Sequence, residues 1–238
     1  MGFTQAGSWR LNSVVVCREV LVTVEIRVTG CQTSLSEAME ISRLIDRYDL
    51  LLTPNCLDDV TCQHVIQEAQ ATGSNPATIY GHSDVGSVND RVRKASRLHL
   101  SSTTTELVNH RLIDHLKTIE QHFSISLKDC EEPQFLRYDV GDFFVAHQDG
   151  NTGLLQLTSD AERKVSVVIF LNRQSDEPDA GTYSGGSLKF SDYRAEPQYR
   201  ELQLTADAGT LVAFRSELTH EVTPVTHGKR YTIVSWYR

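Results

Sequence analysis

Two side chains that can bind a metal lie close together in the segment "RYDVGDFFVAHQDG", residues 137–150: His147 and Asp149. On a β-strand, residues two apart point to the same side, so a strand through this segment would place an imidazole beside a carboxylate. Both groups are common metal ligands. The H-x-D spacing is frequent by chance, however, and a surface histidine beside a solvated aspartate would explain it equally well without a third ligand.

The third ligand has two candidates downstream, His220 and His227. His220 follows the strand-like run "TLVAFRS" and leads into "HEVTPV", whereas His227 sits in the turn-like segment "THGKR". We therefore predict His220 as the partner. Two histidines and one carboxylate on one face of an octahedral metal make up the facial triad of non-haem Fe(II) sites.

Ten residues after His220, Arg230 opens the run "RYTIVSWYR". A guanidinium near such a metal can bind a carboxylate through two parallel hydrogen bonds. The alternative is an ordinary surface ion pair at the start of a strand. On a strand, Thr232 and Trp236 would share the face of Arg230.

The elements that must position these residues divide into helices first and strands afterwards. Apolar residues at helical spacing predict helices over residues 58–71 and 105–123. After residue 131, short β-rich runs separated by Gly- and Pro-containing turns dominate: "QFLRY", "FFVAHQD", "KVSVVIFLN", "GSLKF", "ELQLTA", "TLVAF" and "RYTIVSWYR". This order predicts an α+β or mainly β fold. We expect a double-stranded β-helix core, also called a jelly roll and cupin-like, supported by N-terminal helices.

The polar segment 172–186 reads as a loop between strands, where either a substrate-covering lid or a plain solvated loop would fit. The net charge of −8 and the lack of a basic patch argue against nucleic-acid binding. No apolar run is long enough to cross a membrane, and no signal peptide is recognisable. The five cysteines form no C-x-x-C pair, which favours reduced thiols. We therefore expect a cytoplasmic protein that binds neither nucleic acid nor membrane.

These residues resemble the catalytic domain of 2-oxoglutarate/Fe(II)-dependent dioxygenases of the prolyl 4-hydroxylase type. In that family an H-x-D pair is followed by a distal histidine, and a Lys or Arg nine to ten residues later holds the remote carboxylate of 2-oxoglutarate. The segments that carry the resemblance are "LRYDVGDFFVAHQDG", "VSVVIFLN", "GGSLKF" and "HEVTPVTHGKRYTIVSWY". A weaker likeness extends upstream to residue 49. The resemblance implies a dioxygenase domain over 49–238, with its catalytic core in 131–238, and an N-terminal extension over 1–48 of unknown role.

The resemblance also implies roles for single residues. His147, Asp149 and His220 would hold Fe(II), and Arg230 would bind 2-oxoglutarate. Tyr138 matches a tyrosine that contacts 2-oxoglutarate in the family, and Thr232 would help to hold the same carboxylate. The implied cosubstrates are 2-oxoglutarate and O₂, with ascorbate as a supporting reductant.

The implied reaction is hydroxylation of an unactivated C–H bond with release of succinate and CO₂. The expected substrate is a prolyl residue or another amino-acid-derived group, in a protein, a peptide or a small molecule. Two departures bear on the substrate: Phe144 stands where many prolyl hydroxylases have a tyrosine, and Phe170 stands where some oxygen-sensing relatives have one. Alternatives are a small-molecule hydroxylase of a biosynthetic pathway, a nucleic-acid demethylase, or a binding module without activity.

Overall fold

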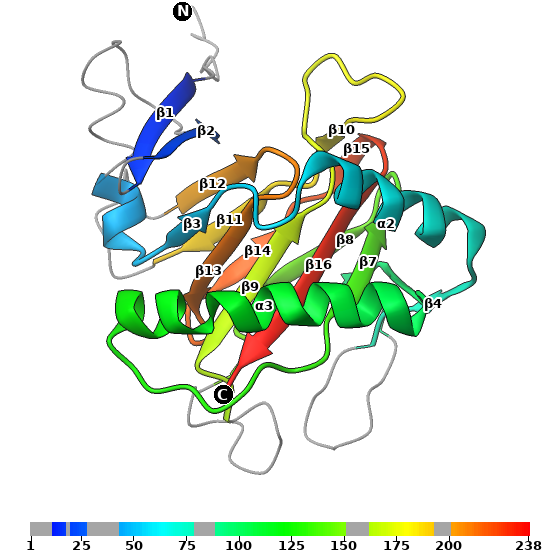
Figure 1. Ribbon diagram of the computed structural model, residues 1–238. Helices are drawn as coiled ribbons and strands as arrows, with labels where there is room; N and C mark the ends of the chain where they lie inside the picture. The colour runs from blue at the N-terminus through cyan, green and yellow to red at the C-terminus, as the bar shows by residue number, and fades with distance from the viewer. Residues whose placement is uncertain (1–10, 18–19, 28–42, 79–88, 151–161, 193–200) are drawn as a thin grey trace, which may run out of the picture.

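The computed structural model describes residues 11–17, 20–27, 43–78, 89–150, 162–192 and 201–238. It contains two seven-stranded antiparallel sheets, here called sheet A and sheet B, and a two-stranded ribbon (Figure 1). In order across sheet A the strands are β1 Leu11–Cys17, β2 Val20–Arg27, β12 Glu201–Ala206, β11 Leu188–Ser191, β14 His220–Val222, β8 Phe143–His147 and β5 Arg93–Lys94. In order across sheet B they are β3 Leu51–Thr53, β13 Leu211–Arg215, β9 Val165–Phe170, β16 Arg230–Tyr237, β7 Gln134–Tyr138, β6 Ser96–Leu98 and β4 Ser74–Pro76. The ribbon pairs β10 Tyr183–Gly185 with β15 Val225–Gly228.

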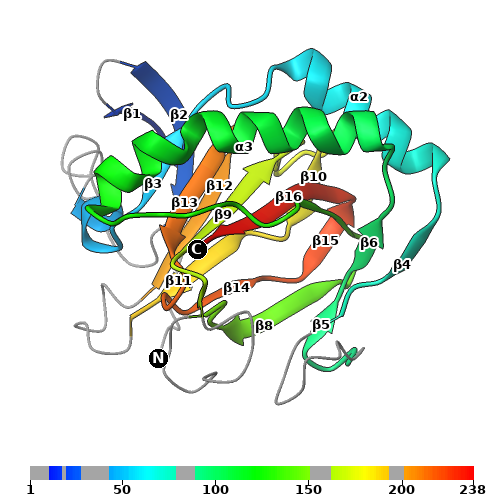
Figure 2. The same cartoon turned by 60° about the horizontal axis from the view of Figure 1, so that its bottom comes forward.

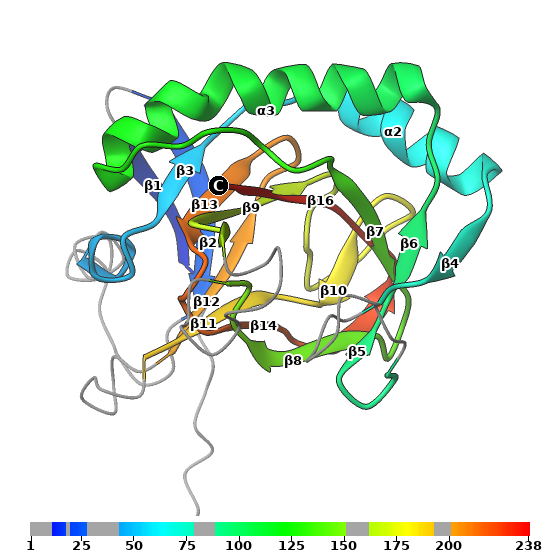
Figure 3. The same cartoon turned by 90° about the horizontal axis from the view of Figure 1, so that it is seen from below.

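The two sheets face each other and enclose the interior of a double-stranded β-helix, which confirms the predicted fold class (Figure 3). Two helices, α2 Asp59–Ala71 and α3 Ser102–Phe123, cover the outer face of sheet B (Figures 1 and 2). Among the described residues, no helix is long and apolar enough to cross a bilayer.

Strand β9 packs against two apolar clusters, one on each face of sheet B. All six of its residues are buried. Val165, Val167 and Ile169 belong to the apolar cluster formed with the helices, whereas Val168 and Phe170 belong to the cluster inside the β-helix. Because the strand is covered on both faces, five of the six residues of "VSVVIF" are apolar, and the buried Ser166 hydroxyl pairs with that of Ser216 at 3.0 Å.

Both predicted helices are present, with one correction. Helix α2 begins after Asp58, whose carboxylate accepts a hydrogen bond from the Thr61 N–H at 2.7 Å. Helix α3 begins at Ser102, three residues before the predicted start at Thr105. The threonines of residues 103–105 are poor helix formers, but Ser101 caps the helix by accepting a hydrogen bond from the Thr104 N–H at 3.3 Å.

The chain before residue 49 contributes to the same sheets and core. Strands β1 and β2 extend sheet A beyond β12. Leu44, Ile45 and Tyr48 are buried in the apolar cluster inside the β-helix. The predicted boundary at residue 48 stays a prediction, and residues 1–10, 18–19 and 28–42 lie outside the described part of the chain.

Gly209 joins sheet B to the start of α2. Its φ angle is +77°. Its backbone N–H donates a hydrogen bond to the carbonyl of Phe170, and its carbonyl accepts one from the N–H of Leu57. A Cβ at this position would lie 1.9 Å from the carbonyl oxygen of Leu57. By contrast, a Cβ at Gly181 would meet no atom within 4 Å.

We therefore expect Gly209→Ala to lower the free energy of unfolding by about 2 kcal/mol or more, because it combines an unfavourable φ with a backbone clash. Gly181→Ala should change it by no more than about 0.5 kcal/mol. Urea unfolding of the two variants and the parent chain checks both values. Equal effects of the two substitutions would contradict the expectation.

Candidate metal centre

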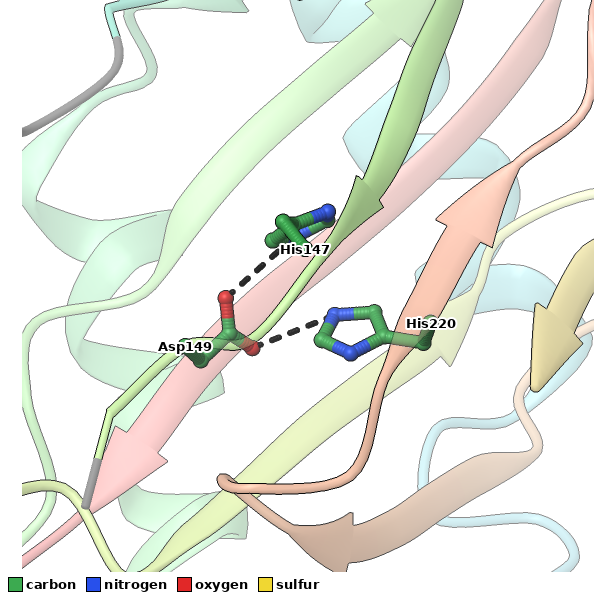
Figure 4. A group of neighbouring side chains, drawn as sticks. All are labelled: His147, Asp149 and His220. Carbon is green, nitrogen blue, oxygen red and sulfur yellow. Dashed lines mark ion pairs between the residues drawn. The ribbon is translucent and has the colours of Figure 1, made fainter. Parts of the chain in front are cut away.

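The three predicted ligands come together inside the β-helix (Figure 4). Strands β8 and β14 pair antiparallel with His147 opposite His220. His147 Nε2 lies 3.4 Å from one carboxylate oxygen of Asp149, and His220 Nε2 lies 3.3 Å from the other. One ligand atom from each residue lies within 4.8 Å of the others. The preference for His220 over His227 is therefore consistent with this grouping, and His227 lies exposed on β15.

One detail of the prediction was wrong. We expected His147 and Asp149 on a single strand, but β8 ends at His147. Asp149 lies beyond the strand, where its backbone N–H donates to the carbonyl of Ser216 at 2.9 Å. This contact, which the sequence does not reveal, fixes the position of the carboxylate beside both imidazoles.

Both imidazoles are oriented by backbone carbonyls. His147 Nδ1 lies 2.8 Å from the carbonyl oxygen of Val145, and His220 Nδ1 lies 2.9 Å from that of Leu218. Because a carbonyl can only accept, each Nδ1 must carry the proton that it donates. Each Nε2 then remains directed to Asp149. This is the arrangement by which proteins orient histidine ligands of metals.

The electrostatics of the group favour a charged carboxylate. Burial alone would raise the pKa of Asp149, but His220 and His147 outweigh burial and hold that pKa well below its usual range. Burial lowers the pKa of His147, helped by the neighbouring His220. Burial would also lower the pKa of His220, but the Asp149 carboxylate reverses the effect and raises it. The site thus offers one carboxylate and two imidazoles to a cation.

A cavity of about 190 Å³ adjoins these residues. The inward-facing side chains of β16 form one wall together with Tyr138 of the neighbouring β7, and Phe144 lines the cavity from β8 in sheet A. Arg230 and Trp236 both line the cavity, so the predicted shared face of β16 is confirmed.

Arg230 is buried in this cavity without a counter-ion among the described residues. It is 1% exposed, and its Nη1 donates to Thr232 Oγ1 at 3.2 Å. Its Nε and Nη2 have no hydrogen-bond partner in the described part of the chain. The guanidinium carbon lies 5.2 Å from the ring centre of Tyr138 and 5.3 Å from that of Phe170. A buried cation with free donors fits an anionic ligand, and a carboxylate matches the fork of donors.

The other two predicted cosubstrate residues also lie at this end of the cavity. Tyr138 pairs directly with Arg230 across β7 and β16, and it is 2% exposed. Thr232 is fully buried. The structure thus brings Arg230, Tyr138 and Thr232 together, and their contacts with a cosubstrate stay predictions.

Tyr183 was missing from the predicted site. It lies on β10 within the segment 172–186, is fully buried, and has no hydrogen-bond partner for its hydroxyl among the described residues. Burial raises the pKa of Tyr183, and the nearby Arg230 opposes the rise. A Cβ added at Gly186 would touch both side chains, at 3.0 Å from Arg230 Cδ and 3.4 Å from Tyr183 Cε2. In the sequence, the only hint of this position is that Tyr183 stands two residues before the pair Gly185 and Gly186.

The two phenylalanines that depart from the family pattern have defined positions. Phe144 stacks on the imidazole of His147, with ring centres 3.6 Å apart and planes 18° apart. Phe170 lies under the Arg230 guanidinium. None of the residues that line the cavity directly comes from the segment 172–186, but Tyr183 of this segment lies beside Arg230, which does line it.

Comparison with known protein families gives a match over residues 133–238 to the 2OG-Fe(II) oxygenase superfamily. Among curated proteins, a PKHD-type hydroxylase of Burkholderia lata is 30% identical over 160 residues, which is 66% of each chain. A PKHD-type hydroxylase of Xylella fastidiosa is 28% identical over 162 residues, again 66% of each chain. The matched part of the chain thus spans about two thirds or less of the length of these relatives.

Solved structures share the fold. A prolyl-4-hydroxylase of Pseudomonas putida superposes with a TM-score of 0.60 at 21% identity, covering 84% of this chain and 97% of the other. A prolyl hydroxylase of Trichoplax adhaerens, solved with a peptide fragment of hypoxia inducible factor, gives 0.59 at 16% identity, covering 87% and 94%. At these identities the likeness establishes the architecture alone.

Proposed function

Since residues 133–238 belong to the 2OG-Fe(II) oxygenase superfamily, we propose that the protein is a 2-oxoglutarate-dependent hydroxylase. The proposed reaction replaces a C–H bond of the substrate by C–OH and releases succinate and CO₂ from 2-oxoglutarate. The observation that supports it best is the combination of the His147, Asp149 and His220 group with the unpartnered Arg230 guanidinium in one cavity.

The donor set fits the group that the family implies. Two imidazole nitrogens and a carboxylate oxygen are the ligands of non-haem Fe(II) sites, and their backbone partners are already in place. His147, Asp149 and His220 would hold the iron. O₂ is the oxidant, and iron and 2-oxoglutarate, when bound, would supply the chemistry by which one oxygen atom enters the substrate as a hydroxyl group and the other enters succinate, with 2-oxoglutarate giving up two electrons as CO₂ leaves.

The protein's own part is binding and orientation. Arg230 would bind the remote carboxylate of 2-oxoglutarate, with Thr232 orienting the guanidinium from the same strand. Tyr183 would donate its hydroxyl to that carboxylate, because it lies beside Arg230 with no other partner among the described residues. Tyr183, from β10, would thus provide the phenol hydroxyl that is absent at position 170, where this chain has phenylalanine instead of tyrosine. Tyr138 would close the apolar wall next to the guanidinium.

The proposed substrate is a prolyl residue or another amino-acid-derived group. Two observations support it: the curated relatives are PKHD-type hydroxylases, and one structure of similar fold was solved with a peptide. A small-molecule hydroxylase with the same iron site is the second candidate. The net charge of −8 disfavours a nucleic-acid demethylase. The intact metal ligands and Arg230 disfavour an inactive binding module. Ascorbate dependence and cytoplasmic location stay predictions.

The direct test is anaerobic titration of the protein with Fe(II) and 2-oxoglutarate, followed by exposure to O₂. We expect a metal-to-ligand absorption band that needs both additions, and then succinate. Mass spectrometry of candidate prolyl peptides and amino acids should find a gain of one oxygen in the substrate. Samples without 2-oxoglutarate are the control. Absence of both the band and succinate would overturn the proposal.

A further inference from the structure

A second arginine, Arg93, lines the cavity on the side away from β16. It lies on β5, the edge strand of sheet A, and pairs with Phe144 of β8 (Figure 3). Arg93 is only 7% exposed. Thr78 and Val92 line the cavity beside it. Arg93 thus reaches the same cavity as the metal centre but from a different sheet than Arg230.

The contacts of Arg93 hold it beside the metal ligands. Its Nη1 donates to the carbonyl of Thr78 at 3.0 Å. Its guanidinium carbon lies 4.8 Å from the ring centre of Phe144, which itself stacks on His147. One aromatic ring therefore separates the guanidinium from a proposed iron ligand.

Arg93 has no acidic partner among the described residues, and its buried Nε has no hydrogen-bond partner there. The neighbouring cations do have acidic partners. Lys94, the next residue, lies 3.1 Å from an Asp142 carboxylate oxygen. Arg163, which also lines the cavity, lies 2.7 Å from a Glu131 carboxylate oxygen. A buried cation without a counter-charge is costly, so its retention points to an anion supplied from outside the described residues, as a bound ligand would supply it.

The charges of the loaded site lead to the same conclusion, on the premise of the proposed function. The divalent metal and Arg230 together carry three positive charges, which equal the two negative charges of 2-oxoglutarate plus the one of Asp149. The charge of Arg163 is balanced by its ion pair with Glu131. Arg93 is then the one charged residue lining the cavity without a counter-charge among the described residues.

We propose that Arg93 binds a carboxylate of the primary substrate. The substrate is then an acid: a free amino acid, a peptide with its C-terminal carboxylate at the site, or a peptide with an acidic side chain next to the oxidised residue. A guanidinium binds a carboxylate through a fixed pair of hydrogen bonds. This contact would orient the substrate within one ring of the metal, and a neutral amide could not replace it.

The competing explanation is that Arg93 only packs against Phe144 and the Thr78 carbonyl. A packing role would affect stability but would not discriminate a carboxylate from an amide. The test therefore measures that discrimination.

The protein is loaded with Mn(II) and 2-oxoglutarate without O₂, and binding of probes is followed by Mn(II)-induced broadening of their NMR lines. The probes are three acid and amide pairs: proline and prolinamide, N-acetyl-alanyl-proline and its amide, and the amides of N-acetyl-aspartyl-proline and N-acetyl-asparaginyl-proline. We expect at least one acid to bind about tenfold to a hundredfold more tightly than its amide partner. The pair that responds identifies the source of the carboxylate.

Three variants complete the design. Arg93→Gln should abolish the preference for the acid, and Arg93→Lys should keep part of it. Arg91→Gln, the same change at an exposed position two residues earlier, should leave it unchanged. The inference is overturned if no acid binds more tightly than its partner in the wild type, or if Arg93→Gln keeps the preference.

Binding of 2-oxoglutarate is measured in every sample. It verifies that each variant is folded, and it separates the two failures. A wild type that binds 2-oxoglutarate but prefers no acid overturns only the assignment of Arg93. A wild type that binds no 2-oxoglutarate overturns the proposed function and this inference with it.

Discussion

Replacing His147 or His220 by alanine should reduce 2-oxoglutarate-dependent succinate formation more than a hundredfold. Each histidine offers Nε2 to the metal while its Nδ1 is held by a backbone carbonyl. Loss of a residue that merely orients a ligand already costs 10- to 100-fold in metal affinity or activity in known metal sites. Loss of the ligand itself should cost more. Succinate formation at saturating Fe(II), together with Fe(II) affinity measured by equilibrium dialysis, checks the expectation.

His227→Ala is the matched control, because it removes the same side chain from an exposed position of β15. It should keep the Fe(II) affinity and the rate of the parent chain. If His227→Ala lost turnover while His220→Ala kept it, the assignment of the third ligand would be wrong. Turnover by His147→Ala at the parent rate would exclude the proposed metal centre altogether.

Arg230→Met should weaken 2-oxoglutarate binding about a hundredfold or more. The guanidinium is fully buried, and two of its nitrogens have no partner among the described residues. Removing one member of a buried charge pair costs about 3–5 kcal/mol, which corresponds to that factor or more. Methionine keeps much of the volume of the arginine stem while removing the charge. Isothermal titration of the Mn(II)-loaded protein without O₂ gives the dissociation constants.

A cosubstrate analogue makes the test specific. 2-Oxopentanoate has the metal-binding keto acid of 2-oxoglutarate but lacks the remote carboxylate. The parent chain should bind it far more weakly than 2-oxoglutarate, and Arg230→Met should bind the two almost equally. Tyr183→Phe should lose a smaller part of the preference, about tenfold at most, because one neutral hydrogen-bond donor is removed. Arg137→Met changes an arginine that pairs with Asp139 instead, and should bind as the parent does. A retained preference in Arg230→Met would refute its role.

The grouping of the candidate metal ligands and Arg230 could be predicted from the sequence because His147, His220 and Arg230 each lie at or beside the end of a strand that is visible in the local pattern. His147 ends an apolar run, His220 follows another, and Arg230 opens a third. Alternation along a strand also placed Thr232 and Trp236 on the cavity side of β16. What the pattern could not give was the position of Asp149, which depends on a backbone contact with Ser216, far away in the sequence.

Arg93 and Tyr183 could not be predicted, for a different reason. They lie on β5 and β10, strands of two and three residues. Such strands are too short to show a period, and only their partners β8 and β15 define them. Both side chains stand out because the described residues provide no counter-ion for Arg93 and no hydrogen-bond partner for the Tyr183 hydroxyl. A missing partner is a property of the folded chain.

The place of β16 has a consequence for biosynthesis. It is the last strand along this sequence, yet it pairs with β9 on one side and β7 on the other. A nascent chain that has emerged only as far as residue 229 would expose two strand edges with no partner between them, and exposed edges invite aggregation. Pairing of β16 with both edges closes sheet B and brings Arg230 into the cavity in the same step, so a chain in which β16 has not yet paired should lack both the closed sheet and the guanidinium.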